Sequence, residues 1–273
     1  MCFAKDKMDR VEAIGCHLAQ ADYDIVCLQE VWCMDDYKSL VNYTKSNMPY
    51  SYYFYSGLNG SGLCVLSRWP IVETLFFKWP LNGYFYMVHH ADWFGGKGVG
   101  LLQIDVAGYL VNIYTTHTHA QYKPGDDDNY LGHRLAQSLD TALLIRRTCR
   151  DADIAILAGD LNSIPSQLCM KTIAHVAKLI DSYEHHDEES GCGTYGPSRN
   201  SYSRGLGEDG GPIGDRIDYI MYRPGVDVLA EVESYTFPLE KQVPGREFSY
   251  SDHEAIAVTL KLSPATSNST ILF

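Results

Sequence analysis

The sequence predicts an α+β protein in which two β-sheets form a central core flanked by helices. Segments with strand-like sequence outnumber helical ones, and several are separated only by short turns, which does not fit a regular alternation of strands and helices. The 273 residues, 45% of them hydrophobic, suffice for one large core. No internal repeat or linker divides the chain, so we expect a single domain over residues 1–262 and a tail over residues 263–273.

The first elements of this layout are a helix and a buried strand. Apolar side chains recur every three or four residues from Met8 to Ala21, which predicts an amphipathic helix that packs on a sheet. The next segment, from Asp24 to Trp32, is almost continuously apolar and predicts a strand buried on both faces. Glu30 lies near the end of this strand, where we expect a functional residue.

The remaining elements follow from the same patterns. Strands are expected at Ser51–Tyr55, Gly62–Leu66, Tyr84–His89, Val99–Val106, Leu110–Thr116, Ile154–Ala158, Ile217–Tyr222 and Ala255–Leu262. Helices are expected at Asp128–Cys149 and Ser166–Ile180. The segment Glu184–Gly214 is rich in Gly, Ser, Asp and Glu, and its length predicts either a mobile loop near the site or a plain surface insertion.

The charge balance argues against a nucleic-acid partner. Lys and Arg total 22 against 34 Asp and Glu, a net charge of −12. Such a surface repels a polyanion unless a metal ion or a local basic groove intervenes.

The cysteines and the first residues indicate an intracellular protein. The eight cysteines are scattered without a CxxC pair, so we expect mostly buried free thiols rather than a disulfide framework. The first ten residues are too polar for a signal peptide, and no apolar run approaches the roughly 20 residues that span a bilayer. We therefore expect a chain that is at most peripheral to a membrane.

Five short motifs place metal-binding or acid–base side chains near predicted strand ends. Each is weak alone, because a strand-end carboxylate is more often a cap or turn residue, and two histidines on one strand face can be a structural pair. The motifs are Gln29-Glu30, Thr116-His117-Thr118-His119, Gly159-Asp160-Leu161-Asn162, Asp215-Arg216-Ile217-Asp218-Tyr219 and Ser251-Asp252-His253-Glu254.

The order and spacing of these five motifs resemble the endonuclease/exonuclease/phosphatase superfamily, from about Asp9 to Leu262. The resemblance implies a four-layer α/β sandwich whose active site lies where the two sheets meet. It also implies Mg²⁺, which prefers oxygen ligands and keeps several waters, so that one carboxylate can hold it against a phosphate.

The same resemblance implies a role for each motif residue. Glu30 would be the metal ligand, and Asp252 would support the metal or the base. His253 would be the general base and Asp218 the carboxylate that orients it. Three further residues complete the implied set: Asp160 would position or activate the water, and His117 and Asn162 would donate to the phosphate.

Within the superfamily, the segments Gly60–Ile71 and Leu81–Lys97 resemble neutral sphingomyelinases. This implies hydrolysis of sphingomyelin to ceramide and phosphocholine at a membrane surface, with His119, Asp92 and Lys97 near the substrate opening. Asp92 and Lys97 can instead form a surface salt bridge of no consequence. The alternatives are a nuclease, a phosphoinositide phosphatase, or a truncated inactive relative that binds lipid. The motif of inositol polyphosphate 5-phosphatases, W-C-D-R, is absent.

Aromatic side chains accumulate in the middle of the chain, at Trp79, Tyr84, Phe85, Tyr86, Trp93 and Phe94. They suit either a surface that reaches the headgroup region of a membrane or an aromatic-rich core. Under the membrane hypothesis, Trp93 and Phe94 are exposed and insert at the interface.

The match departs from the family at the start of the domain. The family's domain opens with a strand that carries an Asn ligand, and no such strand precedes the helix predicted from Met8. We therefore expect Glu30 to be the one clear strand-end ligand, with weaker Mg²⁺ binding, and a sheet edge without its partner.

Overall fold

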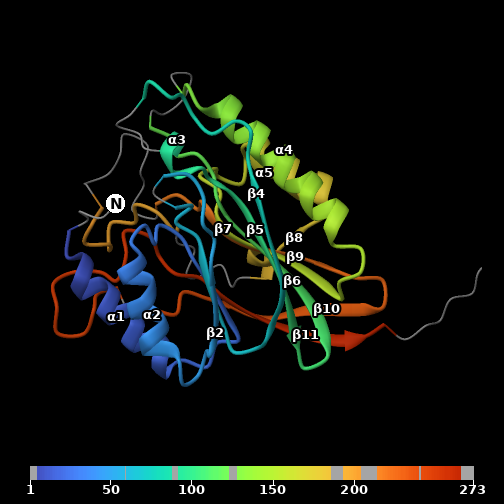
Figure 1. The fold of residues 1–273 in the computed structure, drawn as a ribbon, viewed down its shortest axis with the longest axis horizontal. Coiled ribbons are helices and arrows are strands. Elements are labelled where there is room, and N and C mark those ends of the chain that lie inside the picture. Colours follow the sequence, from blue (N-terminus) through green and yellow to red (C-terminus); the bar gives the residue numbers. More distant parts are fainter. Residues whose placement is uncertain are drawn as a thin grey trace, which may run out of the picture.

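Helices and strands alternate irregularly along the chain, as Figure 1 shows for the computed structural model. The structure describes residues 5–58, 60–87, 92–122, 128–185, 193–203, 214–239 and 241–265. In chain order the elements are α1 (Lys7–Gln20), β1 (Ile25–Leu28), α2 (Met34–Thr44), β2 (Tyr50–Tyr53), β3 (Cys64–Ser67), β4 (Ile71–Lys78), α3 (Asp92–Gly95), β5 (Gly98–Val106), β6 (Tyr109–His117), α4 (Leu131–Thr148), β7 (Ile154–Asp160), α5 (Leu168–Ala177), β8 (Ile180–Asp181), the 3-10 helix η3 (Ser182–His185), β9 (Asp218–Pro224), β10 (Val228–Thr236) and β11 (Ala257–Pro264).

The described strands form three sheets. The largest has the order β4-β5-β6-β7-β9-β8, and smaller sheets have the orders β1-β3-β2 and β10-β11. Strands β6 and β7 run parallel, and α4 connects them. This connection fits the general rule that parallel neighbours need a long crossover.

Four layers follow from the packing of these sheets. Residues of α4 and α5, such as Ile145 and Ile173, pack on one face of the six-stranded sheet with Leu157 of β7. The opposite face of that sheet forms a second core with the smaller sheets. Helices α1 and α2 cover the outer face of the three-stranded sheet, at the opposite side of the molecule from α4 and α5 (Figure 1). The predicted α+β class and four-layer α/β sandwich are confirmed.

Several predicted elements differ from the structure. The expected strand at Tyr84–His89 is absent, because Tyr84–Met87 form a turn, and its last residues lie outside the described ones. Helix α2 and the strands β4 and β10 were not predicted, although the alternation of apolar residues along Val228–Thr236 is a usable signal. Strand β11 continues to Pro264, two residues past the predicted domain end.

Strand β1 is less buried than its sequence predicts. All four of its residues are half-buried, whereas the apolar run predicted burial on both faces. Among the described strands, β3 pairs with one edge of β1 and none pairs with the other. The incomplete burial therefore follows from an open edge.

The cysteines follow the prediction in part. Among the described residues, five are free thiols, and Cys64, Cys149 and Cys169 of these are buried. Cys16 is exposed, and Cys33 is disulfide-bonded, so neither fits the expectation of buried free thiols.

Among the described residues, no helix combines the length and the apolar character needed to cross a membrane.

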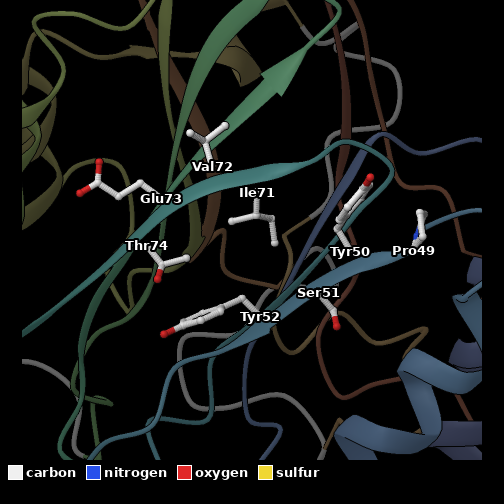
Figure 2. Close-up of a pocket in the computed structure, with 8 residues that line it drawn as sticks. All are labelled: Pro49, Tyr50, Ser51, Tyr52, Ile71, Val72, Glu73 and Thr74. Carbon is white, nitrogen blue, oxygen red and sulfur yellow. The ribbon is translucent and has the colours of Figure 1, made fainter.

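Strand β2 at the edge of the three-stranded sheet and strand β4 at the edge of the six-stranded sheet face each other across a shallow cavity of about 470 Å³ (Figure 2). Its lining is formed by backbone and side chains of Pro49–Tyr52 and Ile71–Thr74. None of the predicted site residues lines this cavity.

Candidate active site

The register of three neighbouring strands brings the predicted catalytic residues together. His117 at the end of β6 is the partner of Asp160 at the end of β7, which in turn is the partner of Asp218 at the start of β9. Directly paired residues on adjacent strands project to the same face of a sheet. The site is therefore built by strand pairing between segments more than 40 residues apart.

Gly159 explains the glycine in the Gly-Asp-x-Asn motif. A Cβ atom at this position would lie 2.0 Å from the carbonyl oxygen of Thr116 on β6. Only glycine lets the two strands approach this closely just before Asp160.

His253 completes the cluster from the far end of the sequence. Its Nδ1–H donates to Oδ2 of Asp218 at 2.8 Å, which leaves Nε2 available to accept a proton. Ligand atoms of Asp160, Asp218 and His253 all lie within 4.8 Å of one another. This arrangement is that of an imidazole base oriented by one carboxylate beside a second carboxylate.

Asn162 and His117 flank Asp160. The backbone N–H of Asn162 donates to Asp160 Oδ1 at 2.8 Å, and its side-chain amide donates to the carbonyl of Thr118 at 3.1 Å. The Nε2 atom of His117 lies 3.5 Å from Asp160 Oδ2. All three predicted residues therefore belong to one cluster.

The cluster contains two carboxyl groups and one imidazole, so ionised Asp160 and Asp218 carry more negative charge than protonated His253 can balance. Burial, followed by repulsion from Asp218, raises the pKa of Asp160 to about 7. Burial opposes ionisation of His253, but Asp218 and then Asp160 and Asp252 together raise its pKa to about 10. In these surroundings His253 holds its proton at neutral pH, and a cation near the carboxylates would favour its release.

Glu30 and Asp252 lie in the same cleft. It has a volume of about 250 Å³, and its lining includes Asp160, Asp218 and His253 of the cluster, Glu30 and Asp252, and Lys7 and Arg10 of α1. Glu30 follows β1 in the left-handed backbone region, with φ of 60°, which is unusual for a residue other than glycine. Oxygen donors of Glu30, Asp160 and Asp218 line one cleft, and such a donor set suits a hard divalent cation.

Asp252 is already bound by a residue that the sequence analysis missed. Its Oδ1 accepts a hydrogen bond from Nη2 of Arg10 at 3.0 Å. Attraction to His253 and Arg10 outweighs the effect of burial and lowers the pKa of Asp252. No local signal links Arg10 to this site, because the two residues are 242 positions apart.

Asp92, Lys97 and His119 form a second cluster that touches the first. Lys97 Nζ lies 2.6 Å from Asp92 Oδ1 and donates to the carbonyl of Thr118 at 3.0 Å and to Nε2 of His117 at 3.1 Å. Lys97 is only 3% exposed, so its ion pair with Asp92 is buried and is not the surface salt bridge that the alternative supposed.

The charges of this second cluster are fixed by burial and by its ion pair. Burial opposes ionisation of Asp92, yet Lys97 and then His119 lower its pKa to about 2. Burial, reinforced by Lys97, lowers the pKa of His117 well below its usual value. Burial lowers the pKa of His119 to about 4, although Asp92 opposes the shift. Both imidazoles are therefore neutral, and Lys97 is a buried cation in contact with His117.

The aromatic residues of the middle segment divide between core and surface. Trp79 is buried, so it belongs to the core and not to a membrane-facing surface. Phe85, Tyr86 and Trp93 are exposed, with 48% of Trp93 accessible, whereas Phe94 is half-buried and packs edge-on against Trp93. The expectation of exposure is thus met by Trp93 and only partly by Phe94.

Sequence comparison identifies a matching family and similar proteins. The sequence profile of the Endonuclease/Exonuclease/phosphatase family matches residues 16–253. The Drosophila melanogaster protein named "Putative neutral sphingomyelinase" is 44% identical over 260 residues, which cover 95% of this chain and 58% of that protein. Sphingomyelin phosphodiesterase 2 of Homo sapiens is 37% identical over 259 residues, covering 94% and 61%. The chain thus spans about three fifths of the length of these relatives.

Solved structures share the fold at low sequence identity. D. rerio TDP2 complexed with a single-strand DNA product matches with a TM-score of 0.72 and 16% identity, over 95% of this chain and 94% of that one. A mutant beta toxin from Staphylococcus aureus with bound magnesium ions matches with a TM-score of 0.65 and 18% identity, over 93% and 92%. These matches establish the fold. The acidic cluster itself indicates a divalent-metal site.

Proposed function

Because this chain belongs to the Endonuclease/Exonuclease/phosphatase family, we propose that it is a Mg²⁺-dependent phosphodiesterase that hydrolyses sphingomyelin to ceramide and phosphocholine. The observation that carries the reaction type is the His253–Asp218 pair beside Asp160 in a cleft that also contains Glu30. The names of the Drosophila and human relatives support the choice of substrate.

In this proposal His253 is the general base. Asp218 accepts a hydrogen bond from the Nδ1–H group and so fixes the orientation of the ring, and Nε2 removes a proton from the attacking water. The oxygen of that water forms a bond to phosphorus while the bond from phosphorus to the ceramide oxygen breaks. The ceramide oxygen takes up a proton and phosphocholine is released. Asp160 orients the water through its carboxylate.

Glu30 would hold the metal with carboxylate oxygens of the cluster, and Asp252 would support the metal or the base. When bound, Mg²⁺ would stabilise negative charge on the phosphoryl oxygens. The carboxylate charge near both residues supports this placement, because burial and then Asp218 raise the pKa of Asp160, and Asp218 and Asp160 raise the pKa of His253 against the effect of burial. His117 and Asn162, which flank Asp160, would donate hydrogen bonds to the phosphoryl oxygens.

Substrate binding would involve the buried Lys97–Asp92 pair and His119. The ammonium group of Lys97 donates to His117 and so lies next to the residues that meet the phosphate. The exposed rings of Phe85, Tyr86 and Trp93 would contact the headgroup region of a membrane, where aromatic side chains are favoured.

The test is release of phosphocholine from sphingomyelin vesicles, with Mg²⁺ and with EDTA, for the wild-type chain and His253→Ala. We expect Mg²⁺-dependent release and a loss of about 10²- to 10⁴-fold in the variant. Release of labelled nucleotide would favour a nuclease, and release of inorganic phosphate from phosphoinositides would favour a phosphatase. Vesicle binding without release of phosphocholine would favour an inactive lipid-binding relative.

A further inference from the structure

Arg10 of α1 joins the first helix to the segment that carries His253. Its Nε–H donates to the carbonyl of Tyr250 at 3.1 Å, and its Nη2–H donates to Asp252 Oδ1 at 3.0 Å. The side chain is largely buried on the wall of the cleft. One guanidinium group therefore holds two residues that lie just before the proposed base.

The guanidinium plane is itself fixed. Its Cζ atom lies 4.7 Å from the ring centroid of Tyr202, a favourable distance for a cation over an aromatic face. The hydroxyl of Tyr202 donates to Asp6 Oδ2 at 3.0 Å, just before α1 begins. Stacking and two directed donors together restrict Arg10 to one orientation, which a flexible ammonium group cannot reproduce.

The segment around His253 is also held from outside α1, because Ser249 and Ser201 exchange hydrogen bonds and His253 forms a β-bridge with Tyr195. Asn200 donates from Nδ2 to the carbonyl of Ser251 at 2.9 Å, and the backbone N–H of His253 donates to Ser251 Oγ at 3.2 Å. Asn200 therefore holds the carbonyl of the residue that lies between the two partners of Arg10. If Arg10 releases Tyr250 and Asp252, the backbone on both sides of Ser251 can shift, and the imidazole shifts with it.

We propose that Arg10 is a positioning residue for the phosphodiesterase reaction. By holding Tyr250 and Asp252 it keeps the imidazole of His253 in line with Asp218 and with the attacking water. This inference rests on the proposed function for the role of His253, although the contacts that it uses do not depend on the substrate.

The test compares Arg10→Lys and Arg10→Ala with a matched control, Arg246→Ala. Arg246 also forms an ion pair with α1, to Asp9 at 3.7 Å, but both side chains are about half exposed and lie outside the cleft lining. We expect kcat to fall about 10- to 100-fold in both Arg10 variants, as for a misplacement of about 1 Å in an active site, with little change in KM. Arg246→Ala should keep the wild-type kcat.

Three measurements separate positioning from loss of structure. Arg10→Lys should melt close to the wild-type temperature and still fail to restore kcat. Added guanidinium should recover part of the kcat of Arg10→Ala. The imidazole NMR signals of His253 should shift in Arg10→Lys and remain unchanged in Arg246→Ala. If Arg10→Lys had wild-type kcat and unshifted His253 signals, or if the loss of kcat only followed unfolding, the proposal would be wrong.

The same measurements distinguish a failure of the proposed function from a failure of the proposal for Arg10. If sphingomyelin is not a substrate but the soluble diester bis(4-nitrophenyl) phosphate is hydrolysed, the kcat comparison is made with that diester. If neither is hydrolysed, the proposed function fails, and the His253 signals alone decide whether Arg10 positions the ring.

Discussion

Replacing Asp160 by Asn should stabilise the metal-free protein at alkaline pH while abolishing activity. Asp160 is buried next to Asp218, and burial together with this repulsion raises its pKa from 3.8 to about 7. Asn keeps the oxygen that accepts the hydrogen bond from the backbone of Asn162, so the local structure is retained. The substitution removes the charge and little else.

The magnitude follows from the difference in proton binding between the folded and unfolded chains. At pH 5 the unfolded chain has released the proton of Asp160, whereas the folded chain still holds it. Because the folded-state pKa is raised, this group makes the protein less stable as pH rises from 3.8 through about 7. Two pH units at about 1.36 kcal/mol each give a loss of roughly 2 to 3 kcal/mol between pH 5 and pH 8.

The substitution also affects His253. The charge of Asp160 helps to raise the pKa of His253, so its removal lowers that pKa. The stability contributed by protonated His253 falls with rising pH in both proteins, and the variant has less of it to lose, so this effect does not reduce the gain of the variant. We therefore expect the free energy of unfolding of Asp160→Asn, relative to the wild type, to increase by roughly 2 to 3 kcal/mol from pH 5 to pH 8.

The assay is urea denaturation in EDTA at both pH values. Asp35→Asn is the matched control, because the Asp35 side chain is 95% exposed and its substitution should have the same small effect at both pH values. Saturating Mg²⁺ should narrow the difference between the wild type and Asp160→Asn. This prediction would be refuted if the difference in unfolding free energy between Asp160→Asn and the wild type were the same at pH 5 and pH 8, or if the wild type were the more stable protein at pH 8. Either result would mean that burial and repulsion from Asp218 do not raise the pKa of Asp160.

Three further predictions concern the metal, the membrane and the open sheet edge. Glu30→Gln should raise the Kd for Mg²⁺ in isothermal titration by roughly tenfold or more, since loss of an outer-shell partner alone lowers metal affinity about 10- to 100-fold. An unchanged Kd would show that Glu30 is not a metal ligand. Trp93→Ala should lower turnover on sphingomyelin vesicles but not on a soluble short-chain analogue, with the exposed Tyr52→Ala as control; equal loss on both substrates would exclude a membrane role. A chain extended upstream by an Asn-bearing strand should have a higher Tm and a lower Kd for Mg²⁺, because the added strand would pair with the edge of β1 that no described strand occupies. Identical Tm and Kd values for the two chains would mean that another residue completes the metal site.

Local sequence patterns determined the main elements and the chemistry at their ends. The three- and four-residue spacing of apolar side chains predicted α1. Apolar runs followed by Glu30 and Asp160, and a run that begins beside Asp218, marked strand ends that carry acid–base groups. These features can be predicted because the apolar spacing of a helix or strand, and the residues at its ends, are all found within one continuous stretch of sequence. The strand predicted at Tyr84–His89 failed for a related reason: its aromatic residues resemble a strand, but Phe85 and Tyr86 lie on an exposed turn.

Only the tertiary structure decided which of these groups meet. Strand pairing aligned His117, Asp160 and Asp218, and the folding of the C-terminal segment brought His253 to within 2.8 Å of Asp218. The burial that makes Lys97 a partner of His117, and the hydrogen bonds by which Arg10 holds the segment before His253, have no local signature. Their contacts join residues 20 and about 240 positions apart, and both the dielectric environment and the hydrogen-bond partners of a charged side chain are set by such distant contacts.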